Sequence, residues 1–257
     1  MGRNRRSLAV TLLVCALATG GCGGADEEPA RLRIEIVGTR PHDPTAFTQG
    51  LDIGGAVRYE GTGMTGASGV RAYDLDSGVE LVRADLPRPY FGEGVALAGA
   101  TLWQITWKDG VAFARDPVTL EVRDRVDYRG EGWGLCARSG RLVMSDGTDT
   151  LTFRDPVTFA ATGTVRLRDR RDAHLNELDC APDGSVYAND YPTDRILRID
   201  PDSGAVLGVV DAGGLLTATE RARTDVLNGI AHLPGTDRFL VTGKYWPTIF
   251  EVRFVPA

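Results

Sequence analysis

Short apolar runs separated by polar turns repeat along most of this chain. One copy, FGEGVALAGATLWQITWK from Phe91 to Lys108, has a glycine-flanked polar residue, an apolar run, a tight turn and a second apolar run. Segments with the same layout begin at Phe47, Glu131, His174 and Val226. Apolar runs of this length, bounded by glycine and proline, predict β-strands. We therefore expect an all-β protein made of repeated hairpins.

The spacing of the repeats predicts a β-propeller. The intervals between equivalent positions are 44, 40, 43 and 52 residues, counted through Gln49, Glu93, Trp133, Asn176 and Asn228. A period of about 40 to 50 residues with several strands per repeat is typical of propeller blades. Two further strands joined by an Asp-containing turn follow the first four repeats, starting at Ala72, Phe113, Phe153 and Arg198. Residues 31–257 are therefore expected to form a five-bladed ring.

The fifth repeat lacks its outer strand, because the chain stops soon after the apolar run from Phe250 to Phe254. The segment from Arg31 to Asp43 resembles the outer strands of the other repeats. We expect this N-terminal strand to pair with the last blade and close the ring, which also protects an exposed sheet edge. An insertion before Asn228 predicts a surface loop or a short helix.

Residues 1–22 have the features of an export signal. Arginines precede the apolar stretch LAVTLLVCALATG, which is short for a membrane span. The sequence TGGCGG, from Thr19 to Gly24, resembles a bacterial lipoprotein cleavage site with Cys22 as the lipidated residue; an ordinary secretory signal cut nearby is the alternative. Residues 23–30 are acidic and polar and should form a flexible tether. We expect an exported protein, either anchored to the membrane at the cell surface through Cys22 or secreted.

Two cysteines, Cys136 and Cys180, belong to the expected domain. They lie at the same register in adjacent repeats, so their strands should be neighbours. A bridge between them depends on Cβ geometry that a sequence does not contain. We expect two buried free thiols.

Charge and motif content argue against several classes of function. The formal net charge is −6, and the chain has no basic stripe of the kind that binds nucleic acid. It has no GxSxG, HExxH, P-loop or CxxC motif, and its three histidines lack metal-ligand spacing. Hydrolysis by a serine triad or by zinc is therefore unsupported. No cofactor or metal is expected, although a structural cation in the central channel stays open.

The five equivalent positions should meet at one mouth of the ring, since the loop before each innermost strand of a propeller lies near the axis. Trp107, Tyr191 and Lys244, at the ends of second strands, should reach the same face. Polar groups in an aromatic hollow are typical of a small-ligand site. Burial there would raise the pKa of Glu93 towards the range useful for proton transfer. The same residues also have a structural interpretation, with Glu93 accepting backbone N–H groups, the asparagines stabilising turns and the tryptophans filling the core.

Seven segments together resemble the plant and bacterial type of glutaminyl-peptide cyclotransferase: PHDPTAFTQGL from Pro41, FGEG from Phe91, WQITWK from Trp103, LNELD from Leu175, YANDYPTDRI from Tyr187, LNGIA from Leu227 and TGKYWPTIFEV from Thr242. The resemblance spans essentially all of the expected domain. It implies a five-bladed propeller that acts without a metal. The N-terminal Gln of a peptide or protein would attack its own side-chain carboxamide, which leaves pyroglutamate and releases ammonia. We expect a monomer whose partners are such N-termini.

The resemblance makes Glu93 the acid/base, with Gln49, Asn176 and Lys244 as candidate donors to the carbonyl oxygen. Together with the convergence at the mouth, it gives the substrate-binding set Phe47, Gln49, Phe91, Trp107, Trp133, Asn176, Tyr191, Asn228 and Lys244. The family commonly has Trp where this chain has Tyr191, so the pocket is smaller or gains a hydroxyl. This difference bears on substrate preference or rate more than on the type of reaction.

Two other functions remain open at this point. A calcium-dependent lactonase or esterase would use Glu93, Asn176 and Asn228 as oxygen ligands. It needs a further acidic ligand at an equivalent position, where Gln49 and Trp133 stand instead. A non-catalytic propeller could also use the mouth as a peptide groove on the cell surface.

Overall fold

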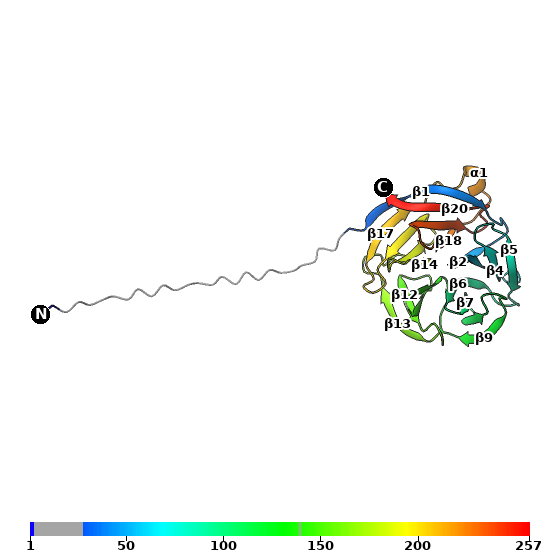
Figure 1. Ribbon diagram of the computed structural model, residues 1–257, viewed down its shortest axis with the longest axis horizontal. Helices are drawn as coiled ribbons and strands as arrows, with labels where there is room; N and C mark the ends of the chain where they lie inside the picture. The colour runs from blue at the N-terminus through cyan, green and yellow to red at the C-terminus, as the bar shows by residue number, and fades with distance from the viewer. Residues whose placement is uncertain (3–27, 139) are drawn as a thin grey trace.

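The computed structural model describes residues 1–2, 28–138 and 140–257, and within these it contains twenty strands and one short helix. The expected export signal, Cys22 and most of the expected tether lie outside the described residues. The sheets surround a common centre in the manner of propeller blades (Figure 1). The prediction of an all-β protein is confirmed.

Three of the sheets contain four antiparallel strands each, in chain order. The first contains β2 (Thr48–Gly54), β3 (Val57–Thr62), β4 (Gly69–Asp74) and β5 (Glu80–Asp85). The second contains β6 (Gly92–Ala98), β7 (Thr101–Thr106), β8 (Val111–Arg115) and β9 (Val122–Asp127). The third contains β10 (Leu135–Arg138), β11 (Arg141–Ser145), β12 (Thr150–Arg154) and β13 (Ala161–Arg166). Each sheet corresponds to one of the repeats in the sequence.

The remaining strands form one eight-stranded sheet in the order β14-β15-β16-β17-β1-β20-β19-β18. Their bounds are β14 (Leu175–Cys180), β15 (Val186–Asp190), β16 (Arg195–Ile199), β17 (Val206–Asp211), β1 (Ala30–Pro41), β20 (Thr248–Pro256), β19 (Arg238–Gly243) and β18 (Leu227–His232). The N-terminal strand β1 pairs antiparallel with β20, as predicted, along Leu32–Pro41. Its first residues also pair parallel with β17, from Ala30 to Arg33, a contact that the sequence did not predict. The strand β1 therefore covers two sheet edges at once.

The insertion before Asn228 carries the helix α1 (Ala218–Arg221), which confirms the predicted loop or short helix. Thr217 and Glu220 form a capping box at its start, in which each side chain bonds the backbone of the other. No helix in the described part of the chain is long and apolar enough to cross a membrane.

Inner strands are buried and outer strands are exposed. In the second sheet, β7 is buried from Leu102 to Thr106, whereas all but one residue of β9 are exposed. The inner strands are buried on both faces because each sheet packs against its neighbours. Trp103, for example, packs on Phe159 of the next sheet, with ring centroids 4.7 Å apart. The side chains of the apolar runs thus form the buried contacts between neighbouring sheets.

A glycine follows the equivalent residue in four of the five repeats, and at three of them the next sheet leaves no room for a side chain. A Cβ on Gly50 would lie 2.5 Å from the backbone nitrogen of Val95, and one on Gly94 would lie 2.6 Å from that of Leu135. A Cβ on Gly134 would lie 2.1 Å from the carbonyl oxygen of Asn176. These glycines allow the inner strands to approach one another closely, which brings the preceding residues around one mouth.

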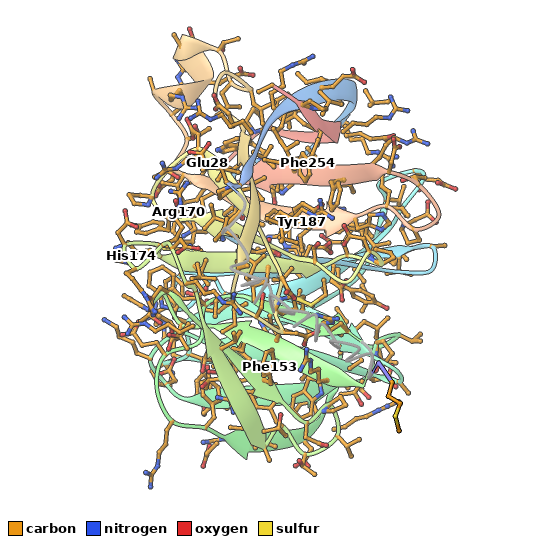
Figure 2. The ribbon with its side chains drawn as sticks, turned by 90° about the vertical axis from the view of Figure 1, so that its left-hand side faces the viewer. Glu28, Phe153, Arg170, His174, Tyr187 and Phe254 are labelled. Atoms are coloured by element: carbon orange, nitrogen blue, oxygen red, sulfur yellow. A yellow bond between two sulfur atoms is a disulfide. The ribbon has the colours of Figure 1, made fainter. Side chains whose placement is uncertain are left out.

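An aromatic cluster and a disulfide tie strands of different repeats together. Tyr187 of β15, Phe239 of β19 and Phe254 of β20 pack together, with the Tyr187 and Phe254 ring centroids 5.4 Å apart (Figure 2). Cys136 of β10 and Cys180 of β14 form a disulfide, so the expectation of free thiols was wrong. The register placed their strands side by side, and the Cα atoms lie 5.4 Å apart, within bridging distance. Closing a loop of 44 residues stabilises the fold by about 4 kcal/mol in the loop-entropy model.

Candidate active site

A cavity of about 270 Å³ lies where the inner strands begin. It is lined by Phe47, Gln49, Met64, Phe91, Glu93, Trp107, Trp133, Asn176, Tyr191 and Lys244. These residues come from all four sheets, and they include every predicted site residue of the mouth except Asn228. The structure therefore brings these predicted residues around one cavity, as the repeat register indicated.

Asn228 lies behind the cavity and not in its wall. Its side-chain nitrogen donates to the Thr48 carbonyl oxygen and to Oε1 of Gln49, both at 3.0 Å. These bonds fix which end of the Gln49 amide faces Glu93. The Nε2 of Gln49 then donates to Oε1 of Glu93 at 2.8 Å. Asn228, Gln49 and Glu93 form one directed chain of hydrogen bonds.

Glu93 is buried, and one of its oxygens is left unpartnered. The side chain is 3% exposed, and Oε2 has no hydrogen-bond partner within the described residues. Burial raises the pKa of Glu93 well above its usual value, because it removes water from the charged form. The positive charge of Lys244 opposes this rise in pKa, and the negative charge of Glu131 adds to it. The protonated form of Glu93 therefore persists to higher pH than that of an exposed glutamate.

Aromatic rings form most of the cavity wall. Phe91 contacts Phe47 on one side and Trp107 on the other, with centroid distances of 6.1 and 5.5 Å. Trp133 and Tyr191 form a second, separate pair at 5.6 Å in an edge-to-face arrangement. Such a wall suits a flat, partly apolar group of small size.

Lys244 reaches the same cavity from the turn after β19. Its Nζ lies 4.7 Å from the centre of the Phe47 ring and 5.6 Å from that of Tyr191. Burial lowers the pKa of Lys244, while the charges of Glu93 and Asp225 raise it. Within the described residues Lys244 makes no ion pair closer than 4.0 Å. Its N–H groups are therefore free to bind a ligand.

Asn176 presents a further free group. Its side-chain oxygen Oδ1 is buried and has no partner in the described part of the protein. The backbone carbonyl of Asn176 accepts a hydrogen bond from the Ser145 hydroxyl at 2.6 Å, which fixes the start of β14. Asn176 thus offers a ligand a hydrogen-bond acceptor in a fixed position, whereas Lys244 offers hydrogen-bond donors.

Two residues of the site were missed by the sequence analysis. Met64 lines the cavity from the loop between β3 and β4, with φ of 83° and 42% of its surface exposed. Glu131 accepts hydrogen bonds from both Trp107 and Trp133. The loop of Met64 belongs to no repeated motif, so nothing in the sequence marked it. Glu131 begins one of the repeats, but its role depends on the positions of two indole nitrogens, which the sequence does not give.

The predicted calcium alternative can be compared with the donor set. In the part of the chain that the structure describes, no group of three or more His, Cys, Asp and Glu side chains is arranged to hold a metal ion. Glu93 is the one carboxylate among the cavity residues, and one of its oxygens already accepts from Gln49. The donors in this cavity do not fit a calcium ion, which needs six to eight oxygens.

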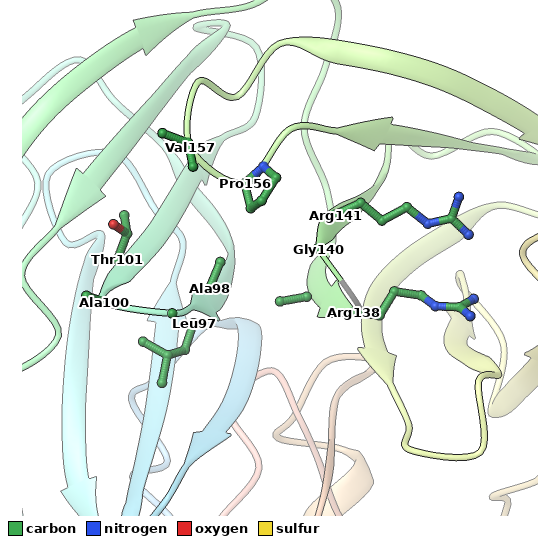
Figure 3. Close-up of a pocket in the computed structure, with 11 residues that line it drawn as sticks. Leu97, Ala98, Ala100, Thr101, Arg138, Gly140, Arg141, Pro156 and Val157 are labelled. Atoms are coloured by element: carbon green, nitrogen blue, oxygen red, sulfur yellow. The ribbon is translucent and has the colours of Figure 1, made fainter.

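A larger hollow of about 560 Å³ lies at the opposite ends of the strands (Figure 3). It is formed by the turns after β6, β10 and β12, and includes Ala98, Thr101 and Val157. Its charged residues are Arg138 and Arg141, and both face Asp202. It brings together none of the predicted site residues and contains no acid/base pair, so the smaller cavity is the candidate active site.

Comparison with known proteins gives a consistent result. A sequence model of the family described as glutamine cyclotransferase matches residues 7–254. Glutaminyl-peptide cyclotransferase from Arabidopsis thaliana is 39% identical over 232 residues, which cover 87% of this chain and 72% of the plant protein. The crystal structure of Myxococcus xanthus glutaminyl cyclase is 39% identical, with a TM-score of 0.79 over 90% of this chain and 100% of that chain. A structure of a nidogen/laminin complex, at 15% identity and a TM-score of 0.52 over 78% of this chain and 73% of that chain, shares the fold alone.

Proposed function

This chain belongs to the glutamine cyclotransferase family, and from that premise we propose that its cavity cyclises N-terminal glutaminyl residues of peptides or proteins. The enzyme is a glutaminyl-peptide cyclotransferase, which forms pyroglutamate and releases ammonia. The observation that carries the assignment of chemistry to this cavity is Glu93, a buried carboxyl with one unpartnered oxygen among aromatic walls.

The reaction needs one proton to move between two nitrogens of the substrate. The α-amine nitrogen attacks the side-chain carboxamide carbon, so a C–N bond forms and the carbonyl π electrons move to oxygen. The amine then loses a proton, and the departing nitrogen gains one as the second C–N bond breaks and ammonia leaves. Because the attack is intramolecular, holding the ring-closing conformer removes much of the entropic barrier. The protein then has to transfer this proton and to stabilise the negative charge that develops on the carbonyl oxygen.

Glu93 carries that proton on Oε2 in our proposal. Gln49 donates to Oε1, which keeps this oxygen occupied as an acceptor. Oε2 can then take the proton from the amine and deliver it to the departing nitrogen. A raised pKa suits both steps, because a carboxyl with an ordinary pKa would be a weak base and a scarce acid at neutral pH.

Lys244 is the donor that best fits the oxyanion. Lys244 lines the cavity, and its positive charge attracts the negative charge that develops on the carbonyl oxygen. Asn176 Oδ1 supplies an acceptor for an N–H group of the substrate. Tyr191, where the family commonly has Trp, packs edge-to-face on Trp133 and is 37% exposed at the mouth. We assign Tyr191 to substrate preference.

A mass assay tests the proposed function. A peptide that begins with Gln should lose one ammonia when it is incubated with the protein. The same peptide with an acetylated N-terminus should not react, because its nitrogen is no longer a nucleophile. The α-amine has a pKa of about 7.7 to 8.0, so the rate should rise towards mildly alkaline pH. No loss of ammonia at any pH from mildly acidic to alkaline would contradict the proposal and favour a binding propeller.

We also propose that the ring has five blades. The three four-stranded sheets would be three of them. The eight-stranded sheet divides at the parallel contact between β17 and β1 into two further groups of four, β14 to β17 and β18-β19-β20-β1. The five repeats in the sequence support this division.

The cellular location is likewise a proposal. Residues 1–22 would export the chain, and Cys22 would carry a lipid that anchors it. The disulfide between Cys136 and Cys180 supports an oxidising compartment outside the cytosol. Changing Cys22 to Ser should move the protein from the membrane to the soluble fraction, whereas an unchanged distribution would favour an ordinary secretory signal. We also propose that the protein is a monomer and that its partners are the N-termini of peptides and proteins.

A further inference from the structure

The aromatic side chains of the cavity wall form two runs, and a charged residue links the two runs on each side. Contacts between aromatic rings run from Phe47 through Phe91 to Trp107, and separately from Trp133 to Tyr191. Lys244 joins these two runs on one side, since its Nζ faces both Phe47 and Tyr191. On the other side, between Trp107 and Trp133, the joining residue is Glu131.

One oxygen of Glu131 holds both tryptophans. Its Oε2 accepts from the indole nitrogen of Trp107 at 2.8 Å and from that of Trp133 at 3.0 Å. Hydrogen bonds from a neutral donor to a carboxylate are stronger than those between neutral groups. The other oxygen lies 3.7 Å from Nζ of Lys108, which also stacks on the outer face of Trp107 at 4.0 Å. Glu131 therefore determines the orientation of two walls at once.

The backbone around Glu131 is built to place it there. Gly130 has φ of 91°, and a Cβ on Gly132 would lie 2.1 Å from the hydroxyl of Tyr128. Gly130 adopts a left-handed conformation that other residues disfavour, and Gly132 lets the segment pass close to Tyr128. The N–H of Gly132 donates to the carbonyl of Trp107 at 2.9 Å, which ties the segment to the neighbouring sheet. The position of Glu131 is fixed independently of its side-chain contacts.

We propose that Glu131 is a positioning residue for cyclisation, which locks Trp107 and Trp133 in the orientation that holds the substrate glutamine in its ring-closing conformer. The inference rests on the proposed function of the cavity. It also gives Glu131 an electrostatic effect on the acid/base, since its negative charge raises the pKa of Glu93. Glu131 does not contact the reacting atoms in this proposal and acts through the two tryptophans and through its charge.

Two variants separate these effects. Glu131→Ala removes the shared acceptor and should lower kcat/KM on the order of tenfold to a hundredfold, because small misplacements of positioning groups are costly in an intramolecular reaction. Glu131→Gln keeps a carbonyl oxygen that can accept both indole N–H groups and should retain most of kcat. Without the negative charge, however, the acid limb of its kcat/KM profile should move to lower pH. Glu121→Gln, the same change at an exposed position beside β9, is the matched control and should alter neither quantity.

The indole N–H signals in a proton–nitrogen correlation spectrum provide a readout that does not depend on activity. The chain has four tryptophans, and Trp103 and Trp246 donate to the carbonyl oxygens of Pro156 and Asp225. In Glu131→Ala the signals of Trp107 and Trp133 should both move upfield, while those of Trp103 and Trp246 stay in place.

The outcomes distinguish the two proposals. If the wild-type protein makes no pyroglutamate, the proposed function fails, whatever the indole signals do. If the wild type is active and Glu131→Ala matches it, or if the two indole signals do not move, the role of Glu131 is wrong. An unshifted acid limb in Glu131→Gln would overturn the electrostatic part of the inference.

Discussion

Two buried glutamates on neighbouring sheets, Glu60 and Glu93, have opposite environments. Glu60 of β3 is 0% exposed, and both of its oxygens have partners. Its Oε1 accepts from the Thr48 hydroxyl at 2.8 Å and lies 2.8 Å from Nε2 of His42, and its Oε2 accepts from Arg58 at 3.1 Å. Glu93 is equally buried but has one donor, Gln49.

The pKa values follow from these partners. Burial alone would raise the pKa of Glu60, but His42 and Arg58 outweigh it and lower the pKa to about 2. The same pairing raises the pKa of His42, although burial and Arg58 oppose the rise. For Glu93 burial dominates, and its pKa is raised. Burial therefore does not by itself set the direction of the pKa shift; the charged partners beside the carboxyl decide it.

The two environments begin at adjacent residues. Thr48 and Gln49 are consecutive at the start of β2, and they donate to Glu60 and to Glu93 respectively. The same strand start thus supplies a bond to the ion-paired carboxyl of Glu60 and a bond to Glu93, the proposed acid/base. Changes at either glutamate should separate stability from activity.

The largest expected effect is on activity. Glu93→Gln should reduce kcat by roughly 10²- to 10⁴-fold, the usual contribution of a general acid/base. The amide keeps an acceptor for Gln49 and removes the cost of a buried charge, so the free energy of unfolding at neutral pH should stay the same or rise. Steady-state kinetics and urea unfolding measure both quantities on one preparation. Full turnover in this variant would remove Glu93 from the mechanism.

Glu60→Gln should give the reverse pattern. It leaves His42 and Arg58 without their buried counter-charge, which costs roughly 3–5 kcal/mol of unfolding free energy. Where the variant is still folded, kcat should remain close to that of the wild type, because Glu60 does not line the cavity. Urea unfolding with an activity assay below the transition provides the test. A stable Glu60→Gln variant without activity would show that Glu60 serves the reaction and not the stability of the fold.

The repeat register explains why the sequence could predict which residues surround the cavity. In a ring of equivalent repeats, residues at one register position must meet near the axis, and Gln49, Glu93, Trp133 and Asn176 line one cavity in the structure. The glycine after three of them turned out to have a steric cause that follows from the same geometry. Position around the axis is therefore encoded in periodicity.

The periodicity does not give the direction in which a side chain points or the group that it contacts. Asn228 has the predicted register, yet its side chain turns behind Gln49 because the Thr48 carbonyl and Gln49 Oε1 are the acceptors it reaches. The disulfide depended on a Cα separation, and the parallel contact of β1 with β17 depended on how far the N-terminal strand extends. Glu131 needed the positions of two indole nitrogens. Each of these contacts is set by side-chain reach or by a distance between sheets.

The pH dependence of stability should differ in sign between the two glutamates. The folded pKa of Glu60 is lowered from 4.5 to about 2, so its stabilising contribution is present above about pH 4.5 and is lost as the pH falls towards 2. This contribution is up to about 3 kcal/mol. For Glu93 the folded pKa is raised, so its destabilising contribution appears as the pH rises from 4.5 through the folded value.

Urea unfolding as a function of pH measures these slopes. Glu60→Gln should flatten the acid side of the curve, and Glu93→Gln should flatten the neutral side. Equal slopes in the wild type and both variants would mean that other groups carry the pH dependence, among them Asp179, whose pKa burial raises to about 7.

The smallest expected effect comes from Asn228, which acts on Glu93 only through Gln49. Asn228→Ala removes the bond that orients the Gln49 amide, worth roughly 0.5–1.5 kcal/mol, and should lower kcat by a few-fold to about tenfold. Asn228→Asp should lower it further, because a carboxylate beside Gln49 would attract Nε2 and draw it away from Glu93. Neither variant should change KM as much as kcat, since Asn228 does not line the cavity. If Asp proved more active than Ala, the direction of the hydrogen-bond chain would have to be reversed, with Glu93 protonated on Oε1 and donating to Gln49.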